Sequence, residues 1–140
     1  MSLRKLSNQN LDSNLKQLVI SEREILREIL LHIVEVQRRR LFLTFGYSSL
    51  FCYLTQHIGY ANGSAQRRID AARLSFEVPE VIEKLESGEI NLSQVSLLQK
   101  AIREVQSVSK VKVDQNGSAG LKRDSFHRFT GHSWIVNTVL

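Results

Sequence analysis

The sequence has few of the residues that cross-link or interrupt a small domain. Its 140 residues include one cysteine, one proline, one methionine and one tryptophan. A single cysteine, Cys52, excludes an intrachain disulfide, a CxxC pair and a zinc finger. The N-terminal residues lack the apolar segment of a secretory signal. These absences favour a cytoplasmic protein, in which we expect Cys52 to be a small buried hydrophobe.

Long apolar runs are missing as well. Residues 41–66 carry no charged side chain, but Gly46–Ser49 and Gln56–His57 interrupt the segment. A membrane span needs roughly 18 apolar residues, so we expect this segment to be buried and the chain to have no contact with a membrane. With 42% hydrophobic and 24% charged residues, the chain has the composition of one globular domain with its own core.

Motifs of catalysis and metal binding are also absent. The chain holds no Walker loop, GxSxG or HExxH sequence, and its four histidines lack matching Cys or carboxylate spacing. We therefore predict no catalytic residue, no cofactor and no metal ligand. The net charge of +5 permits an acidic partner. Residues 61–106, however, contain six basic and seven acidic side chains, so a nucleic-acid interface has to rest on local clusters.

Apolar residues recur at helical spacing from the start of the chain. Leucines at positions 11, 15 and 18 predict a short first helix. Ser21 and Glu24 then have the spacing of a capping box, which predicts the start of a second helix. A broad apolar stripe continues from Ile25 and indicates that this helix runs to about Arg40.

A turn at Gly46–Tyr47 precedes two shorter helices. Ser48 or Ser49 is expected to cap the third helix, which Gly59 ends. Asn62 or Ser64 is expected to cap the fourth. The residues expected to face the core are Leu50, Phe51, Leu54 and Ile58 on the third helix and Ala65, Ile69, Ala72 and Phe76 on the fourth.

Two more helices are predicted before residue 106. Pro79 lies in the first turn of a fifth helix, which Gly88 ends, and Asn91 or Ser93 opens a sixth. The expected inner face of the sixth helix consists of Val95, Leu98, Ala101, Ile102 and Val105. No strand-like alternation occurs up to residue 106. The sequence therefore predicts an all-α, multi-helix bundle.

The composition changes near Gln106. Residues 107–140 are rich in Ser, Gly and His, include the turn-forming run Asn116–Gly120, and place valines at 108, 111 and 113 that would suit a short strand. We expect an N-terminal tail at residues 1–10, one helical domain at 11–106 and a divergent, poorly ordered tail at 107–140.

The third and fourth helices flank a glycine-containing turn, which is the pattern of a helix-turn-helix. The fourth helix starts with polar and basic residues on the side opposite its apolar stripe. Glutamine and arginine make bidentate contacts with bases, and arginine also binds phosphate. The residues predicted to contact double-stranded DNA are Gln66, Arg67, Arg68 and Arg73, assisted by the basic cluster Arg38, Arg39 and Arg40. Alternatively, the two helices belong to a bundle with a solvated polar face, and the cluster only complements a helix C-terminus.

Linked motifs between residues 46 and 98 carry a family resemblance. They are Gly-Tyr-Ser-Ser-Leu-Phe at a helix start, Arg-Arg-Ile-x-Ala-Ala-Arg within a helix, and Pro-Glu-Val followed by Leu-x-x-Gly-x-Ile-Asn-Leu-Ser. The segment resembles the helical N-terminal region of bacterial HNH endonucleases, and the likeness covers roughly residues 11–113. In that family the nuclease chemistry belongs to a separate C-terminal metal-binding module. His127, His132 and Asn137 do not reproduce its motif, which implies an accessory region that lacks the module through truncation or frameshift.

Two functions follow from these patterns. The first is a non-catalytic DNA-binding domain that acts through the basic fourth helix. The alternative is a protein interaction or oligomerisation module, in which the long helix from Glu22 to Arg40 packs against a partner. A steep loss of affinity with salt would indicate phosphate contacts, whereas helix packing responds weakly to salt.

Overall fold

The computed structural model describes the backbone of residues 2–116 and the side chains of residues 2–110, and this part of the chain forms helices and no strand. The all-α prediction is confirmed. In chain order the elements are η1 (Leu3–Lys5), α1 (Asn8–Arg39), α2 (Leu41–Thr44), α3 (Leu50–Cys52), η2 (Tyr53–Ile58), α4 (Asn62–Glu77), α5 (Glu80–Ser87) and α6 (Leu92–Asn116). Within the described residues, no helix combines the length and the apolar character needed to cross a membrane.

α1 is one continuous helix of 32 residues, where the sequence indicated two. Its N-cap is Ser7, whose side chain accepts a hydrogen bond of 3.2 Å from a first-turn amide. The predicted capping box at Ser21 and Glu24 is wrong. Both residues lie inside the helix, where backbone amides already donate to carbonyls one turn earlier. The predicted end is confirmed to within one residue, because Arg40 leaves the helix with φ 50°.

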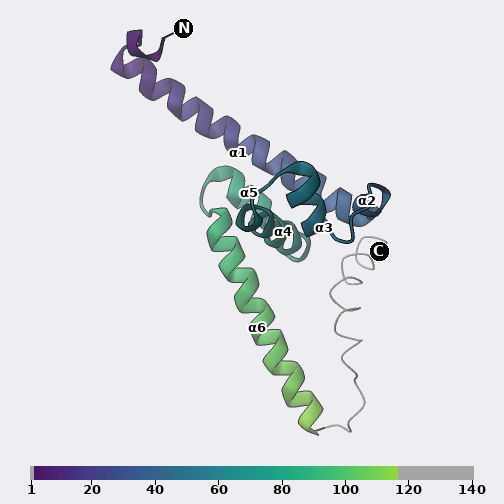
Figure 1. Ribbon diagram of the computed structural model, residues 1–140. Coiled ribbons are helices and arrows are strands. Elements are labelled where there is room, and N and C mark those ends of the chain that lie inside the picture. Colours follow the sequence, from purple (N-terminus) through teal and green to yellow (C-terminus); the bar gives the residue numbers. More distant parts are fainter. Residues whose placement is uncertain (1, 117–140) are drawn as a thin grey trace.

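The two halves of α1 have different surroundings. Residues 7–18 are all exposed, and the buried residues of α1, Leu30 and Ile33, both lie in its second half. The second half packs against α4 and α5, while the first half projects away from the other helices (Figure 1). We call residues 8–20 the arm. Its side chains are exposed to solvent, except for that of Val19, which is half-buried.

Two apolar clusters hold the helices together. The first consists of Ile33, Phe42, Leu50, Tyr53, Leu54, Ala65, Ile69 and Ala72. The second consists of Leu30, Ala71, Leu74, Val81, Leu85 and Val95. Because α4 contributes to both, it is packed on two sides and is the central helix of the fold, with α1, α3, α5 and α6 around it (Figure 1).

Several predicted boundaries are confirmed. Ser49 caps α3, and its Oγ accepts a hydrogen bond of 3.1 Å from the Cys52 amide. Gly59 and Gly88 end the preceding helices with φ 98° and 83°, a left-handed conformation that favours glycine. Asn91 opens α6 with a capping box, since its side chain accepts from a backbone amide at 3.0 Å and a glutamine side chain reaches back. These caps and glycines depend only on residues within one turn, and the structure contains each of them where it was predicted.

Two boundaries differ from the prediction. α4 begins at Asn62, and its N-cap Ala61 makes no side-chain hydrogen bond, so neither Asn62 nor Ser64 acts as the cap. α6 continues to Asn116, beyond the expected end near Gln106 and through the expected strand. β-Branched residues lower helix propensity by less than about 1 kcal/mol each, so an established helix propagates through them. The prediction for residues 117–140 lies outside the described residues.

The expected inner faces are correct for α4 and wrong for parts of η2 and α6. Ile58, Leu98, Ala101 and Val105 were expected inside and are exposed. On α6, Val95 and Ile102 turn toward the core as predicted, and Gln99, which was not predicted, joins them. These three residues follow a spacing of four and three, and they define a narrower contact face than the full apolar stripe.

Candidate functional site

The helix predicted to read DNA is embedded in the fold. Its buried residues are Ala65, Ile69, Asp70, Ala71, Ala72, Leu74 and Ser75, and only residues 62, 63 and 77 are classed as exposed. A helix in the major groove needs a free side along its N-terminal half. The four predicted contact residues on α4, Gln66, Arg67, Arg68 and Arg73, are all half-buried, and Arg73 lies in the C-terminal half of the helix.

Gln66 and Arg73 take part in a polar contact between α4 and α6. Asp70, only 4% exposed, accepts hydrogen bonds from Gln66 Nε2 at 2.9 Å, from Ser96 Oγ at 2.6 Å and from Arg103. Arg73 is half-buried beside them. Burial lowers the pKa of its guanidinium, and the positive charge of Arg103 lowers this pKa further. The negative charge of Asp70 raises the pKa and so opposes both effects. Gln66 and Arg73 are therefore held by partners within the protein.

Arg68 and Arg67 differ although they are adjacent. The Arg68 guanidinium lies 4.4 Å from the centre of the Tyr60 ring, and its Nη1 donates to the carbonyl of Ser64 at 3.1 Å. Stacking of this kind fixes a cation against the fold. Arg67 makes no hydrogen bond or ion pair with any described residue. Of the three arginines predicted to contact DNA on α4, Arg67 is therefore the one whose guanidinium is not held by another described residue.

The basic cluster lies at the end of α1. Arg38 donates to the Glu35 carboxylate at 2.5 and 2.9 Å, and Arg39 donates to it at 2.5 Å. These hydrogen bonds lower the pKa of Glu35 to about 2. Arg40, in its left-handed conformation, is exposed. Two of the three cations are thus partly neutralised, and no hydrogen bond or ion pair joins this cluster to the α4 residues within the described structure.

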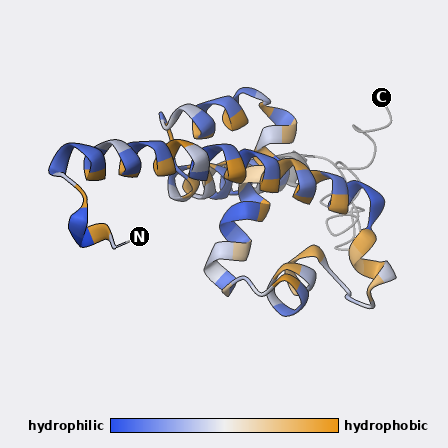
Figure 2. Ribbon diagram, turned by 90° about the horizontal axis from the view of Figure 1, so that it is seen from above, coloured by the Kyte–Doolittle hydropathy of each residue, from blue (hydrophilic) through white to orange (hydrophobic). Residues whose placement is uncertain are grey.

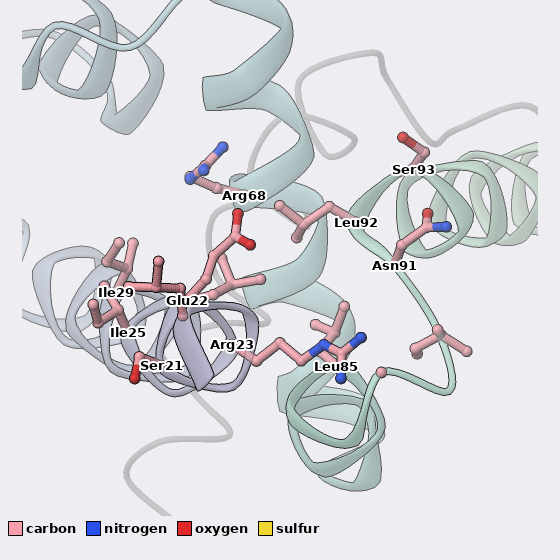
Figure 3. Close-up of a pocket in the computed structure, with 14 residues that line it drawn as sticks. Ser21, Glu22, Arg23, Ile25, Ile29, Arg68, Leu85, Asn91, Leu92 and Ser93 are labelled. Carbon is pink, nitrogen blue, oxygen red and sulfur yellow. The ribbon is translucent and has the colours of Figure 1, made fainter. Parts of the chain in front are cut away.

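The structure shows a groove along the second half of α1 that the sequence analysis did not predict. One stretch, of about 680 Å³, lies between α1, Arg68 of α4, Leu85 of α5 and the segment 88–93. The adjoining stretch, of about 640 Å³, lies between α1, α2 and η2 and ends at Tyr60. Ile25 and Ile29 line both stretches, and the Arg68–Tyr60 stack lies where they meet. Figure 3 shows the first stretch, with Ile25 and Ile29 on α1 and Arg68 on α4.

The groove continues an apolar stripe that begins on the arm. Figure 2 shows apolar positions recurring along one edge of α1. The stripe, which we call the seam, consists of Leu11, Leu15, Leu18, Ile25, Ile29 and Val36. Its spacings of four, three, seven, four and seven follow a heptad repeat, in which Glu22 and His32 fill the two remaining positions. Leu11, Leu15, Leu18 and Ile25 are 45%, 60%, 66% and 60% exposed.

The seam and groove are suited to binding. Aliphatic side chains on a helix face, bordered by acidic residues such as Glu24 and Glu28, match the apolar face of another helix. The described residues contain no group of three or more His, Cys, Asp or Glu side chains that could hold a metal ion. The heptad spacing was available in the sequence, but the incorrect helix boundary at Ser21 divided it between two helices.

Comparison of the chain with protein-family models, with curated proteins and with solved structures finds no match. The likeness to the N-terminal region of HNH endonucleases therefore stays a prediction from the sequence.

Proposed function

We propose that this chain is a non-catalytic helical interaction module that binds an amphipathic helix through the seam of α1. The observation that carries this proposal is the exposure of Leu11, Leu15, Leu18 and Ile25 on one face of one helix. Single exposed leucines are ordinary on protein surfaces, whereas contiguous apolar patches occur where proteins bind one another.

The form of the surface supports a helical partner. The arm extends beyond the other helices (Figure 1), so a second helix can lie along it without meeting the rest of the fold. Further along α1, the groove walls at Tyr60 and Leu85 border the seam on the side of the body. Helix-in-groove recognition uses anchors spaced at i, i+3, i+4 and i+7, which is the spacing of the seam.

Site-specific photocrosslinking tests the proposal. A photoreactive residue replaces Leu15 on the seam or, as the control, Leu43, which is 52% exposed on α2 and outside the groove. We expect a crosslinked protein from position 15 and none from position 43. After identification by mass spectrometry, that protein should bind the purified wild-type chain and fail to bind the Leu15→Asp variant. Equal crosslinking from both positions would contradict the proposal.

DNA binding is a second candidate, and the unengaged guanidinium of Arg67 favours it. Fluorescence anisotropy of a labelled duplex, titrated at low and moderate salt, tests this candidate with Arg67→Ala. Arg68 is left unchanged because it stacks on Tyr60, and Lys100→Ala on α6 serves as an exposed control cation. If Arg67 contacts phosphate, Arg67→Ala weakens binding and reduces the salt slope by about one. Equal loss in both variants would indicate diffuse charge attraction.

A further inference from the structure

We propose that the seam binds a second copy of this chain, with the two α1 helices antiparallel and the arm of each copy lying in the groove of the other. This inference rests on the proposed function and names its partner. It requires one surface that is complementary to itself about a two-fold axis, which is the usual geometry of a homodimer.

α1 carries both halves of such a surface. The arm offers a projecting ridge of three leucines, and the groove offers a recess centred on Ile25 and Ile29. Both belong to the same heptad repeat, so their spacings match. In an antiparallel register centred on position 20, Leu11 lies over Ile29 of the second copy and Leu15 over Ile25 of the second copy. The same contacts then form twice.

Charge favours the antiparallel arrangement over the parallel one. Residues 2–20 contain three basic side chains and one acidic side chain, whereas residues 21–36 contain four acidic and two basic ones. Antiparallel pairing places the basic segment of one copy beside the acidic segment of the other. Parallel pairing would place like charges together, which weakens association.

The other exposed apolar face is a poorer match for the arm. α6 exposes Leu97, Leu98, Val105 and Val108, but residues 97–110 contain three basic side chains and one acidic side chain. This surface has the same sign of charge as residues 2–20. The acidic segment 21–36 of α1 is therefore the favoured site for the basic segment 2–20 of the second copy.

The contact between the two α1 helices requires the groove walls as well as the seam. The overlap from position 11 to position 29 spans about 27 Å, at 1.5 Å per residue, and each helix is about 10 Å wide. The groove walls at Tyr60 and Leu85 widen the contact on both sides of the two-fold axis. The helix pair alone covers about 270 Å², so the groove walls have to supply most of the roughly 800 Å² per partner of a standard interface. Because each arm projects from its fold (Figure 1), the two bodies lie at opposite ends of the helix pair.

Sedimentation equilibrium of the full chain over a range of concentrations is the first test. We expect a species of twice the 16.0 kDa chain mass, and at least tenfold weaker association for Leu15→Asp. Leu15 is exposed in the single chain, so the variant should keep its helical circular dichroism. The control Leu43→Asp places the same charge on exposed α2 and should leave the dimer unchanged.

Position 14 tests the register. Asn14 is exposed on the outer flank of the seam, and the antiparallel register places it near Glu28 of the second copy. Asn14→Lys should tighten the dimer by about threefold to tenfold through two new exposed ion pairs, and Asn14→Glu should weaken it by a similar factor. In parallel pairing position 14 would lie beside Val19 of the second copy, and both substitutions would have nearly the same effect.

The outcomes separate this inference from the proposed function. A chain that stays monomeric, while position 15 crosslinks to a different protein that requires Leu15, overturns the second copy as partner and keeps the interaction module. A monomeric chain with no specific crosslink at position 15 overturns both. A dimer that tolerates Leu15→Asp but is lost in Leu98→Asp/Val105→Asp would place the interface on α6 and overturn the inference.

Discussion

The Ser96 hydroxyl on α6 donates a hydrogen bond of 2.6 Å to Asp70 on α4, although 26 residues separate them. Asp70 is buried and also accepts hydrogen bonds from Gln66 and Arg103. A buried carboxylate requires such partners, because removing its charge from water is costly. α6 contributes few buried apolar residues, so this polar contact is a large part of what holds it against α4.

Replacing Asp70 should therefore destabilise the fold. We expect Asp70→Ala to lower the free energy of unfolding by about 3 kcal/mol, because it leaves Ser96 and Arg103 without their acceptor and opens a small cavity. Urea denaturation followed by circular dichroism measures the change.

Asp12→Ala is the matched control. Asp12 pairs with Lys16 at 2.8 Å, but both side chains are more than half exposed, and such pairs contribute less than about 0.5 kcal/mol. A similar loss of stability in both variants would contradict a special role for the buried aspartate.

Two glycines should respond oppositely to a methyl group. Gly88 has φ 83°, and a Cβ there would lie 2.5–2.7 Å from the Arg23 guanidinium. Gly88→Ala should lower the free energy of unfolding by about 1–2 kcal/mol from backbone strain alone. Gly63 lies in the first turn of α4, where a Cβ meets only the flexible end of Arg67 at 3.3 Å. Gly63→Ala should raise the free energy of unfolding by about 0.5 kcal/mol.

Thermal unfolding of the two glycine variants measures both effects. Destabilisation by Gly63→Ala would mean that the Arg67 side chain cannot move aside. An unchanged melting temperature in Gly88→Ala would mean that the turn between α5 and α6 adjusts freely.

Local chemistry made much of the fold predictable. Ser49, Gly59, Gly88 and Asn91 act where the sequence placed them, because caps and left-handed glycines depend on residues within one turn. The same rules failed at Ser21. A capping box stabilises a helix start only if the chain before it is not helical, and the residues before Ser21 continue α1. Sequence signals of this kind permit a boundary without requiring one.

The candidate site was less predictable because α4 has two apolar faces. Ala65, Ile69 and Ala72 were recognised as one face, whereas Ala71 and Leu74 form a second that packs against α5 and α6. Polar residues between the two faces were therefore assigned to solvent or DNA. Two of the partners of Asp70, Ser96 and Arg103, lie 26 and 33 residues away, and no local pattern identifies them.

The end of α1 should show an unusual acid titration. Hydrogen bonds from Arg38 and Arg39 lower the pKa of Glu35 from 4.5 to about 2 in the folded chain. A lowered pKa means that the carboxylate contributes stability above about pH 4.5, and that this contribution is lost as the pH falls toward 2. Because the group is exposed, the effect on stability is small.

Nuclear magnetic resonance titration of the Glu35 carboxyl carbon measures this pKa directly. Arg38→Gln should raise the midpoint toward 4.5, since it removes the largest cause of the shift. Arg40→Gln removes a cation of the same cluster that donates no hydrogen bond to Glu35, and it should leave the midpoint nearly unchanged. Equal shifts in the two variants would show that general positive charge, and not hydrogen bonding, sets the pKa.

Gln99 offers a substitution that should stabilise the protein. It is 7% exposed on α6, and its Oε1 is buried without a hydrogen-bond partner in the described part of the chain. An unpaired buried amide oxygen costs about 1–3 kcal/mol, whereas an apolar side chain of similar size avoids this cost. We expect Gln99→Leu to raise the free energy of unfolding by about 1 kcal/mol, measured by urea denaturation. Gln106→Leu makes the same replacement on the exposed part of the same helix and therefore controls for the difference in helix propensity between glutamine and leucine. It should change the free energy of unfolding by less than about 0.5 kcal/mol. A loss of stability in Gln99→Leu would show that the amide makes a favourable interaction between α6 and the core.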